Sequence, residues 1–257
     1  MIHSAAIIDP KAEIGKGVEI GPYSVIERDV SIGEGTKVGP HVIIREGTRI
    51  GKGCRVFQFA SIGEAPQFLG YKGEKTFLQI GDRNIIREFV TLHRGTMRGG
   101  GKTVIGNDNY LMAYSHVAHD CQIGNEVVMA NGATLAGHIL IEDYAIIGGL
   151  SAIHQYCRVG THAFISGLTG VSLDIPPYML SSGSRAKLFG LNAVGLKRHR
   201  FSEETLRALK KAYRVIFRSG LTLENATKKV GEDDIFRIPE VQHLLQFIQH
   251  SKRGICR

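Results

Sequence analysis

The sequence has no apolar run long enough to cross a membrane. A transmembrane helix needs about 20 consecutive apolar residues, and no uncharged apolar run of this chain reaches that length. The amino terminus also lacks the basic segment, followed by an apolar one, that marks a secretory signal peptide. We therefore expect a cytoplasmic protein with no stable membrane insertion.

Cysteine is scarce, and the few cysteines show no paired spacing. The four are Cys54, Cys121, Cys157 and Cys256. Neither a zinc motif nor a disulfide framework has this arrangement. Because an isolated free cysteine usually behaves as a small buried hydrophobic residue, we expect reduced thiols that fill gaps in the core.

Proline is sparse while glycine is abundant, with 7 prolines against 32 glycines in 257 residues. Low-complexity chains are rich in both residues, so the imbalance indicates that glycine occupies set positions in a repeating backbone. The hydrophobic fraction of 43% and the charged fraction of 22% are those of an ordinary folded protein.

Acidic residues are fewer than basic ones, 24 against 32, which gives a net charge of +8 and a pI of about 9.4. A net positive charge favours binding to acidic partners. Composition leaves four classes open: nucleic acid, phosphorylated metabolites, an acidic carrier protein and an anionic membrane surface.

The first sixty residues carry an aliphatic side chain at every sixth position. From Ile2 to Ile62 that position is always Ile or Val. Glycine often follows it, as at Gly15 and Gly33, which suits a tight corner after a short strand. A six-residue period is typical of a parallel β-helix with flat faces, and three faces make a coil of about 18 residues.

Two segments interrupt the repeat, and we expect them to leave the β-helix as loops. Residues 64–79 keep the phase but carry Pro66, Gly70 and Gly73 and no regular pattern. The segment near 94–104 shifts the register by one residue, after which the aliphatic positions run without exception from 105 to 171. Loops on a rigid scaffold often carry binding residues.

The repeat is expected to end at residues 174–177, because the adjacent prolines Pro176 and Pro177 cannot join a hydrogen-bonded ladder. Beyond them, Ser202 and the acids after it predict a helix start, with an apolar stripe that ends at Gly220. Further helices are predicted around 190–200, from Thr222 and after Pro239. We thus expect a β-helix domain over 1–187 and a C-terminal α-helical domain over 188–257.

Basic residues are frequent in the expected helical domain. Two interpretations stay open: they form a solvated helix face, or they form a docking surface for an acidic partner. They are Lys197, Arg198, His199, Arg200, Arg207, Lys210, Lys211, Arg214 and Arg218.

Stacking of the coils brings polar residues from distant segments together. Residues 18 apart lie above one another at about 4.8 Å, so His119, Gly137 and Gln155 share one column. Because polar groups pay a desolvation cost inside an aliphatic core, we expect them to point outward. Three further histidines lie beside this column: His116, His138 and His154.

This polar group is compatible with three functions. A histidine base could deprotonate a hydroxyl while a glycine corner presents its N–H to a developing oxyanion, which acyl transfer from a thioester needs. The imidazoles could instead hold zinc or another divalent metal, as in β-helical carbonic anhydrases. The third reading is a scaffold without catalysis.

Seven motifs then connect the chain to a known family. They are residues 80–84 (IGDRN), 92–96 (LHRGT), 118–121 (AHDC), 133–138 (ATLAGH), 146–149 (IIGG), 174–178 (DIPPY) and 195–198 (GLKR). Together they resemble the UDP-N-acetylglucosamine acyltransferases, which open lipid A synthesis in Gram-negative bacteria. The resemblance covers nearly the whole chain, whereas hexapeptide repeats alone would indicate only the wider acyltransferase superfamily.

The resemblance implies a mainly β fold, a left-handed parallel β-helix of hexapeptide repeats with C-terminal helices, assembled as a homotrimer with active sites between subunits. It implies that His119 is the general base that activates the 3-hydroxyl of the glucosamine unit. That hydroxyl attacks the thioester of a (R)-3-hydroxyacyl acyl carrier protein. Asp120 orients the base, and the backbone N–H of Gly137 binds the oxyanion.

The resemblance also implies the substrates and the residues that contact them. The partners are acyl carrier protein and UDP-N-acetylglucosamine, or the 3-amino analogue of that sugar nucleotide, with no metal, no cofactor and no nucleic acid. The residues that match substrate-contacting positions are His116, His138, His154, Gln155, Asn192, Arg198, Gln67 and Leu69.

The chain departs from the family pattern in the first loop. Phe68 and Gly70 stand where better-known members carry an aspartate and a lysine, so either Lys72 substitutes or the grip on the nucleotide differs. Val194 likewise stands where a glutamate is familiar.

Gly167 matches the position that limits acyl length in the family. A glycine there leaves room for a longer chain, and the nearby Phe164 could shorten it. We expect an acyl chain of intermediate to long length.

Overall fold

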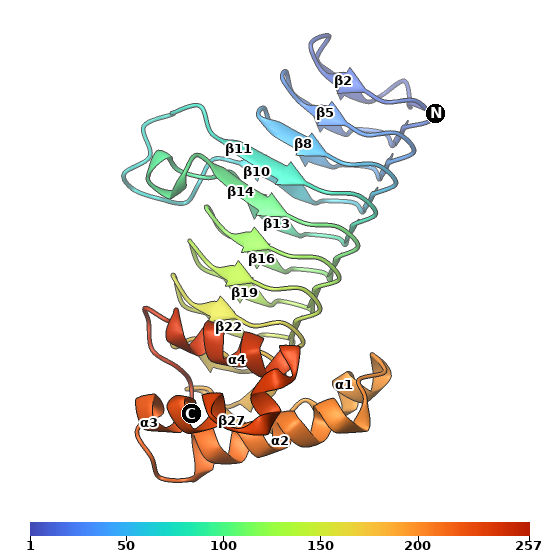
Figure 1. Cartoon of the computed structure of the whole chain (residues 1–257). Helices are drawn as coiled ribbons and strands as arrows, with labels where there is room; N and C mark the ends of the chain where they lie inside the picture. The colour runs from blue at the N-terminus through green and yellow to red at the C-terminus, as the bar shows by residue number, and fades with distance from the viewer.

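The computed structural model describes residues 1–257 as a three-sided prism of short parallel strands with helices at its C-terminal end (Figure 1). Each hexapeptide contributes one strand, mostly of two residues, and a turn carries the chain to the next face. The three faces are sheets of nine, eight and ten strands.

The strands follow the order of the coils along each face. The nine-stranded sheet contains β1 (Ile7–Ile8), β4 (Val25–Ile26), β7 (Ile43–Ile44), β10 (Ser61–Glu64), β13 (Thr91–His93), β16 (His116–Val117), β19 (Thr134–Leu135), β22 (Ala152–Ile153) and β25 (Gly170–Val171). The eight-stranded sheet contains β2 (Glu13–Ile14), β5 (Ser31–Ile32), β8 (Thr48–Ile50), β11 (Phe77–Ile80), β14 (Lys102–Ile105), β17 (Gln122–Ile123), β20 (Leu140–Ile141) and β23 (Arg158–Val159). The ten-stranded sheet contains β3 (Glu19–Ile20), β6 (Lys37–Val38), β9 (Arg55–Val56), β12 (Ile85–Ile86), β15 (Tyr110–Leu111), β18 (Val128–Met129), β21 (Ile146–Ile147), β24 (Phe164–Ile165), β26 (Met179–Ser182) and β27 (Lys187–Leu191).

The register of the sheets confirms the predicted 18-residue coil. His116 pairs with Thr134, and Thr134 pairs with Ala152 in the next coil. The sixth-position side chains fill the prism, so that Val117 and Leu135 are fully buried. Burial of such aliphatic side chains stabilises the fold by about 1.5–3 kcal/mol each.

The corners of the prism require backbone in the left-handed region. Asp120, His138 and Tyr156 have φ of 62°, 61° and 65° and stack along one edge, here called the histidine corner. Tyr144 and His162, with φ of 62° and 53°, stack along the next edge, here called the 144–162 corner. Non-glycine residues rarely adopt this conformation, and here the closure of each coil demands it.

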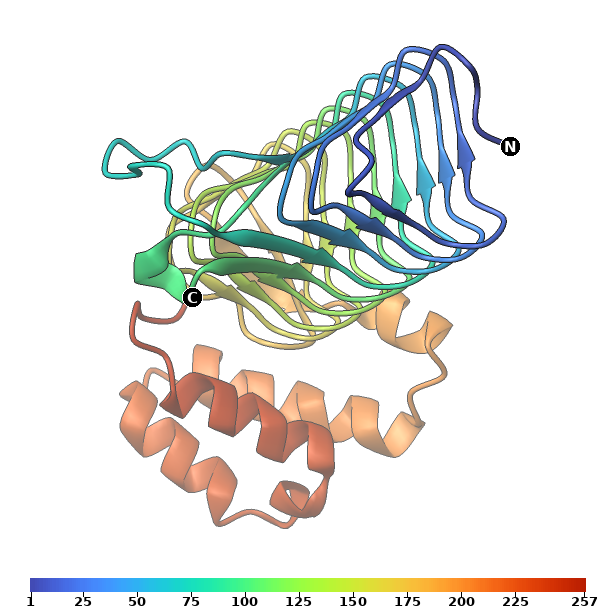
Figure 2. The same ribbon diagram turned by 90° about the horizontal axis from the view of Figure 1, so that it is seen from above.

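Two loops leave the prism side by side (Figure 2). Both reach the histidine corner, because Phe68 lies against His119 and Thr96 donates to Asp120. The first lies between β10 and β11, and the second, between β13 and β14, contains η1 (Met97–Gly99). Both are shorter than expected from sequence, because β11 and β14 are four-residue strands that pair with each other before the chain returns to the repeat.

The prediction that the repeat ends at the double proline was wrong, because one more parallel strand follows the prolines. β26 pairs in parallel with β24 after the prolines, and β27 adds an antiparallel strand, so the sheet extends to Leu191. The prolines occupy the turn before β26 and donate no ladder hydrogen bond, which is why they are tolerated there. The boundary expected after residue 187 falls at the first residue of β27.

The helices follow at the C-terminal end of the prism. They are α1 (Ala193–Arg198), α2 (Glu203–Arg218), α3 (Leu223–Gly231), η2 (Asp234–Arg237) and α4 (Pro239–Gln249). Ser202 caps α2 by accepting from the Thr205 N–H. No helix combines the length and the apolar character that a membrane span requires. All four cysteines are free and buried, as predicted.

The last residues return from α4 to the prism. Ile255 bridges to Asp174, and the Cys256 N–H donates to the Asp174 carbonyl. The segment 250–253 therefore lies beside the C-terminal coils.

Candidate functional site

His119 and Asp120 form the centre of the site at the histidine corner. His119 Nδ1 lies 2.8 Å from Asp120 Oδ2. Because an ionised carboxylate can only accept, Nδ1 carries the proton and Nε2 keeps its lone pair. The His119 side chain is 12% exposed and that of Asp120 is fully buried. The pair thus presents one free imidazole nitrogen.

Asp120 is fixed by hydrogen bonds to Thr96 of the second loop and to Thr103 of β14. Its Oδ1 accepts from the Thr96 N–H and its Oδ2 from the Thr96 hydroxyl, both at 2.7 Å. The Asp120 N–H donates to Thr103 Oγ1 at 2.8 Å. An added Cβ at Gly99 would overlap the carboxyl group, so glycine lets η1 close over the aspartate. These bonds compensate the burial of the carboxylate.

Gly137 lies one coil beyond His119 and touches its ring. A Cβ at this position would lie 2.5 Å from His119 Cε1. The Gly137 N–H donates to no acceptor within the protein. At the corresponding corners of the next face, the N–H groups of Asn107 and Asn125 donate to a side chain one coil further on. A free, buried backbone N–H beside an imidazole is suited to donate a hydrogen bond to a developing oxyanion.

His138 packs against both members of the pair. Its ring centroid is 5.1 Å from that of His119, and its Nε2 is 3.6 Å from Asp120 Oδ2. On its other side it stacks on Tyr156 at 4.6 Å. Burial lowers the pKa of His138, and the Asp120 carboxylate opposes that shift.

His116 lies in β16, three residues before His119, and is supported by two neighbours. Its Nδ1 is 2.7 Å from the Thr91 hydroxyl, and the buried His93 ring meets it edge-on at 5.0 Å. Burial first, and then the nearby His119, lower the pKa of His116. Burial lowers the pKa of His93 to about 4. Both rings are therefore neutral at pH 7.

The first loop covers His119 with an aromatic ring. Phe68 lies with its ring centroid 5.7 Å from that of His119, and the Arg98 guanidinium lies 5.6 Å from the Phe68 centroid. A Cβ at Gly70 would lie 2.6 Å from Phe68 Cε1, so glycine permits this fold of the loop. The neighbouring Gln67 and Leu69 are exposed.

His154 and Gln155 lie one coil further along the same edge and are exposed. His154 Nδ1 is 2.9 Å from Arg253 Nη2, which ties it to the C-terminal segment. The Gln155 side chain makes no hydrogen bond to the Gly137 N–H below it.

The other predicted substrate contacts lie elsewhere on the chain. Asn192 caps α1 and donates to the His162 carbonyl at 3.0 Å, which places it at the 144–162 corner. Arg198, in the same helix, is exposed. Gly167 precedes Leu168 at the third edge of the prism. One copy of the chain does not bring these residues next to His119.

Full-length relatives match this chain. An acyl-(acyl-carrier-protein)–UDP-N-acetylglucosamine O-acyltransferase from Thermodesulfovibrio yellowstonii is 56% identical over 256 residues, which cover 100% of this chain and 99% of its own. The chain belongs to the UDP-N-acetylglucosamine O-acyltransferase family.

Solved structures and family models agree with this assignment. The acyltransferase of Bacteroides fragilis has a TM-score of 0.98 at 44% identity, with 100% of each chain covered. That of Moraxella catarrhalis has a TM-score of 0.96 at 44% identity, covering 100% of this chain and 99% of its own. Domain 2 of UDP N-acetylglucosamine O-acyltransferase matches residues 174–256, and the bacterial transferase hexapeptide (six repeats) matches 102–137. The predicted left-handed β-helix is confirmed.

The same corner of this acyltransferase also offers possible metal ligands. One ligand atom each from His119, Asp120 and His138 lie within 4.8 Å of one another. Both Asp120 oxygens already accept hydrogen bonds from Thr96, however, and Oδ2 also faces the proton of His119 Nδ1. A cation at Oδ2 would therefore compete with these hydrogen bonds.

Several residues of the site were not singled out from the sequence. Thr96 holds Asp120 from 24 positions away, and Arg253 holds His154 from 99 positions away. Neither segment has the six-residue period, so stacking arithmetic could not place them. Tyr156 could have been found, because it follows Gln155 and lies 18 residues beyond His138.

Proposed function

We propose that the chain transfers a (R)-3-hydroxyacyl group from acyl carrier protein to the 3-hydroxyl of UDP-N-acetylglucosamine, the first step of lipid A biosynthesis. The observation that carries this proposal is the full-length match to the relative from Thermodesulfovibrio yellowstonii, whose name gives an O-acyl transfer from acyl carrier protein to UDP-N-acetylglucosamine. The basic helices dock the acidic carrier, and the reaction takes place in the cytoplasm.

In this mechanism His119 Nε2 removes the proton from the sugar hydroxyl as its oxygen attacks the thioester carbonyl. The carbonyl oxygen becomes an oxyanion that accepts from the Gly137 N–H. Collapse of the intermediate breaks the carbon–sulfur bond, and the proton held by His119 passes to the leaving thiolate. Asp120, 2.8 Å from Nδ1, stabilises the imidazolium in between.

The neutral histidines around the base support this chemistry. Burial lowers the pKa of His116 and of His138. Uncharged imidazoles bind a polar sugar by hydrogen bonds without competing with His119 for the aspartate.

The remaining contacts come from a second copy of the chain in a homotrimer. Asn192 and Arg198 belong to the α1 end of the molecule, one face of the prism away from the histidine corner. A cleft between neighbouring copies would bring that end to His119, with Gln155 and His154 on one wall. Gly167 then limits the length of the acyl chain.

The test is an acylation assay with purified protein. UDP-N-acetylglucosamine and a mixture of acyl carrier proteins with different (R)-3-hydroxyacyl chains are incubated, and the product is identified by mass spectrometry. We expect a single ester product with a chain of intermediate to long length. A parallel reaction with the 3-amino analogue distinguishes an amide-forming enzyme, and absence of product with either acceptor would contradict the proposal.

A metalloenzyme of the β-helical carbonic anhydrase type is the second candidate, favoured by the proximity of His119, Asp120 and His138. Elemental analysis of the active protein tests it. Full acyltransferase activity at near-zero zinc occupancy would exclude a metal role in the reaction.

A further inference from the structure

The first loop reaches the base but is joined to the rest of the chain by a single hydrogen bond. Its residues 66–76 bond almost entirely to one another. The exception is the bond that Arg94 donates to the Tyr71 hydroxyl at 3.2 Å. The same loop places Phe68 against His119, so the position of this aromatic cover depends on how the loop is held.

Arg94 provides this bond from a fixed position at the end of β13. Its side chain is only 11% exposed. While Nη2 donates to the Tyr71 hydroxyl, Nη1 donates to the Glu46 carbonyl of the prism at 3.0 Å. Because the guanidinium is a rigid planar fork, the two bonds tie the loop to that coil in one geometry.

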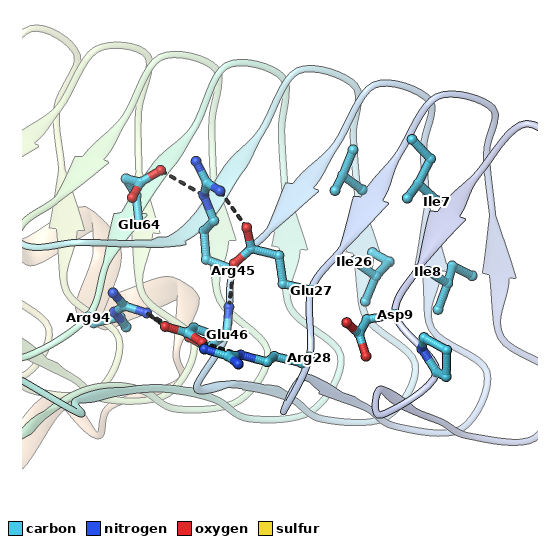
Figure 3. Close-up of a pocket in the computed structure, with 12 residues that line it drawn as sticks. Ile7, Ile8, Asp9, Ile26, Glu27, Arg28, Arg45, Glu46, Glu64 and Arg94 are labelled. Carbon is cyan, nitrogen blue, oxygen red and sulfur yellow. Dashed lines mark hydrogen bonds and ion pairs between the residues drawn. The ribbon is translucent and has the colours of Figure 1, made fainter. Parts of the chain in front are cut away.

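The coils beside Arg94 are held by ion pairs around a pocket of about 740 Å³ (Figure 3). Arg45 pairs with Glu64 at 2.9 Å, and Arg28 pairs with Glu46 at 2.9 Å. These charges neutralise one another, and the Glu46 carboxylate lies 3.8 Å from Arg94, beyond hydrogen-bond distance. The hydrogen bonds of the Arg94 guanidinium therefore go to the neighbouring carbonyl and to the loop.

From Tyr71 the contacts continue to the base. The Tyr71 N–H donates to the Phe68 carbonyl at 3.0 Å, and the Tyr71 hydroxyl donates to the Glu74 carbonyl at 2.8 Å. The Phe68 ring then packs on His119 with 5.7 Å between the ring centroids. A continuous path of contacts thus runs from the guanidinium to the imidazole.

The segment that carries Arg94 also holds the other member of the catalytic pair. Thr96, two residues further on, donates to Asp120 from its N–H and from its hydroxyl. Residues 94–96 therefore act on His119 from two sides, through the loop that covers its ring and through the carboxylate that orients it.

We propose that Arg94 is a positioning residue for the acyl transfer, which holds the first loop through Tyr71 so that Phe68 covers His119. The inference rests on the proposed function, in which His119 is the base. Without this bond, residues 66–76 keep no hydrogen bond to another segment, and a loop with so few bonds opens readily. Each opening withdraws Phe68 and admits water to the imidazole.

The experiment starts from Tyr71→Phe, which removes one hydroxyl and keeps the ring. Since Tyr71 acts through Phe68, kcat/KM should fall by no more than the roughly two- to tenfold loss expected for Phe68→Ala. Arg94→Lys keeps the charge without the planar fork and should show a loss of the same kind. Thermal unfolding of both variants confirms that they are folded.

The decisive measurement is a double-mutant cycle, because a general loss of stability would not depend on Phe68. In a Phe68→Ala background, Tyr71→Phe should cause no further loss of kcat/KM. Trypsin should also cleave after the exposed Lys72 faster in Tyr71→Phe than in the wild type, since the loop opens more often.

Tyr213→Phe is the matched control. Arg218 donates to the Tyr213 hydroxyl at 2.9 Å and to the Leu188 carbonyl at 2.8 Å, the same pair of acceptors as at Arg94, but in the helical domain. This variant should keep the kinetics and the Lys72 cleavage rate of the wild type.

Each outcome decides the proposal. Wild-type kcat/KM in Tyr71→Phe, an unchanged rate of cleavage after Lys72, or additive losses in the double variant would each overturn the inference. All three leave the proposed function intact, because the wild-type protein still turns over. Absence of turnover in the wild type would overturn both.

Discussion

His119 and Asp120 are adjacent in sequence, and their side chains meet at 2.8 Å because Asp120 has a φ of 62°. In an extended strand, neighbouring side chains point to opposite faces. The turn at the corner rotates Asp120 back beneath the imidazole, and the aspartate stays buried while His119 reaches the surface. A bend required by every coil thus creates an oriented base.

Replacement of His119 by alanine should lower kcat by about 10²- to 10⁴-fold, the usual contribution of a positioned general base. KM for both substrates should change little, because the imidazole acts on the proton. Steady-state kinetics checks this, with thermal unfolding as the test of the fold. His41→Ala, an exposed histidine at another corner, should remain fully active. If His119→Ala keeps more than a few per cent of the wild-type activity, His119 is not the base.

Asp120→Asn should lower kcat by about 10²-fold or more, because an amide cannot stabilise the imidazolium or fix the tautomer as a carboxylate does. Thr96→Val removes the hydrogen bond that Asp120 Oδ2, the oxygen facing His119, accepts from the Thr96 hydroxyl. It should lower kcat less, by about tenfold. Both variants should displace the acidic limb of the pH profile of kcat. An unchanged profile in Asp120→Asn would show that the aspartate is structural.

The sequence predicts the prism well because its core imposes one rule on every coil. An aliphatic residue is needed wherever the chain passes the interior, so the period alone identifies the strands from Ile20 to Val171. The same rule aligned His119 with Gly137. It does not apply outside the repeat, so the hydrogen bonds from Thr96 and Arg253 could not be predicted.

The double proline illustrates the limit of a local rule. Pro176 and Pro177 cannot donate to a ladder, but the chain needs only a turn to pass them, and β26 then rejoins the sheet. Local chemistry predicted an interruption there. Whether the sheet resumes depends on packing against β24, which no short window of sequence contains.

Gly137→Ala should lower kcat by about 10²-fold, since a misplacement of about 1 Å at the reacting groups can cost that much. Its Cβ would lie 2.5 Å from His119 Cε1 and push the ring from its position. Gly170→Ala is the matched control, because the nearest atom to its added Cβ is 3.8 Å away. Equal activity of the two variants would contradict this steric argument. Single-turnover kinetics measures the chemical step directly.

Phe68→Ala should reduce kcat/KM roughly two- to tenfold, the loss of an aromatic contact worth about 0.5–1.5 kcal/mol. Phe68 packs on His119 at 5.7 Å, so its removal loosens the base and admits water. Gly70→Ala should produce part of the same loss by displacing Phe68. Lys75→Ala, an exposed residue of the same loop, is the control. Wild-type kinetics in Phe68→Ala would show that the ring does not support the base.

The stability of the protein should fall as the pH drops from about 6.5 towards 4. His93 is 4% exposed, and burial lowers its pKa to about 4, against about 6.5 in the unfolded chain. In this window the unfolded state binds a proton that the folded state excludes, so acid favours unfolding. A shift of about 2.5 units corresponds to about 3 kcal/mol.

His93→Phe tests this account, because the buried Nδ1 of His93 has no hydrogen-bond partner to lose. Denaturant unfolding at pH 7 and pH 4 should show a smaller acid-dependent loss in the variant, by about 3 kcal/mol. His41→Phe keeps a ring in the exposed stack between Tyr23 and Phe59 and should retain the wild-type dependence on pH. If His93→Phe unfolds with the same pH dependence as the wild type, the proton is taken up elsewhere. His162, whose pKa burial also lowers to about 4, would then be the next residue to replace.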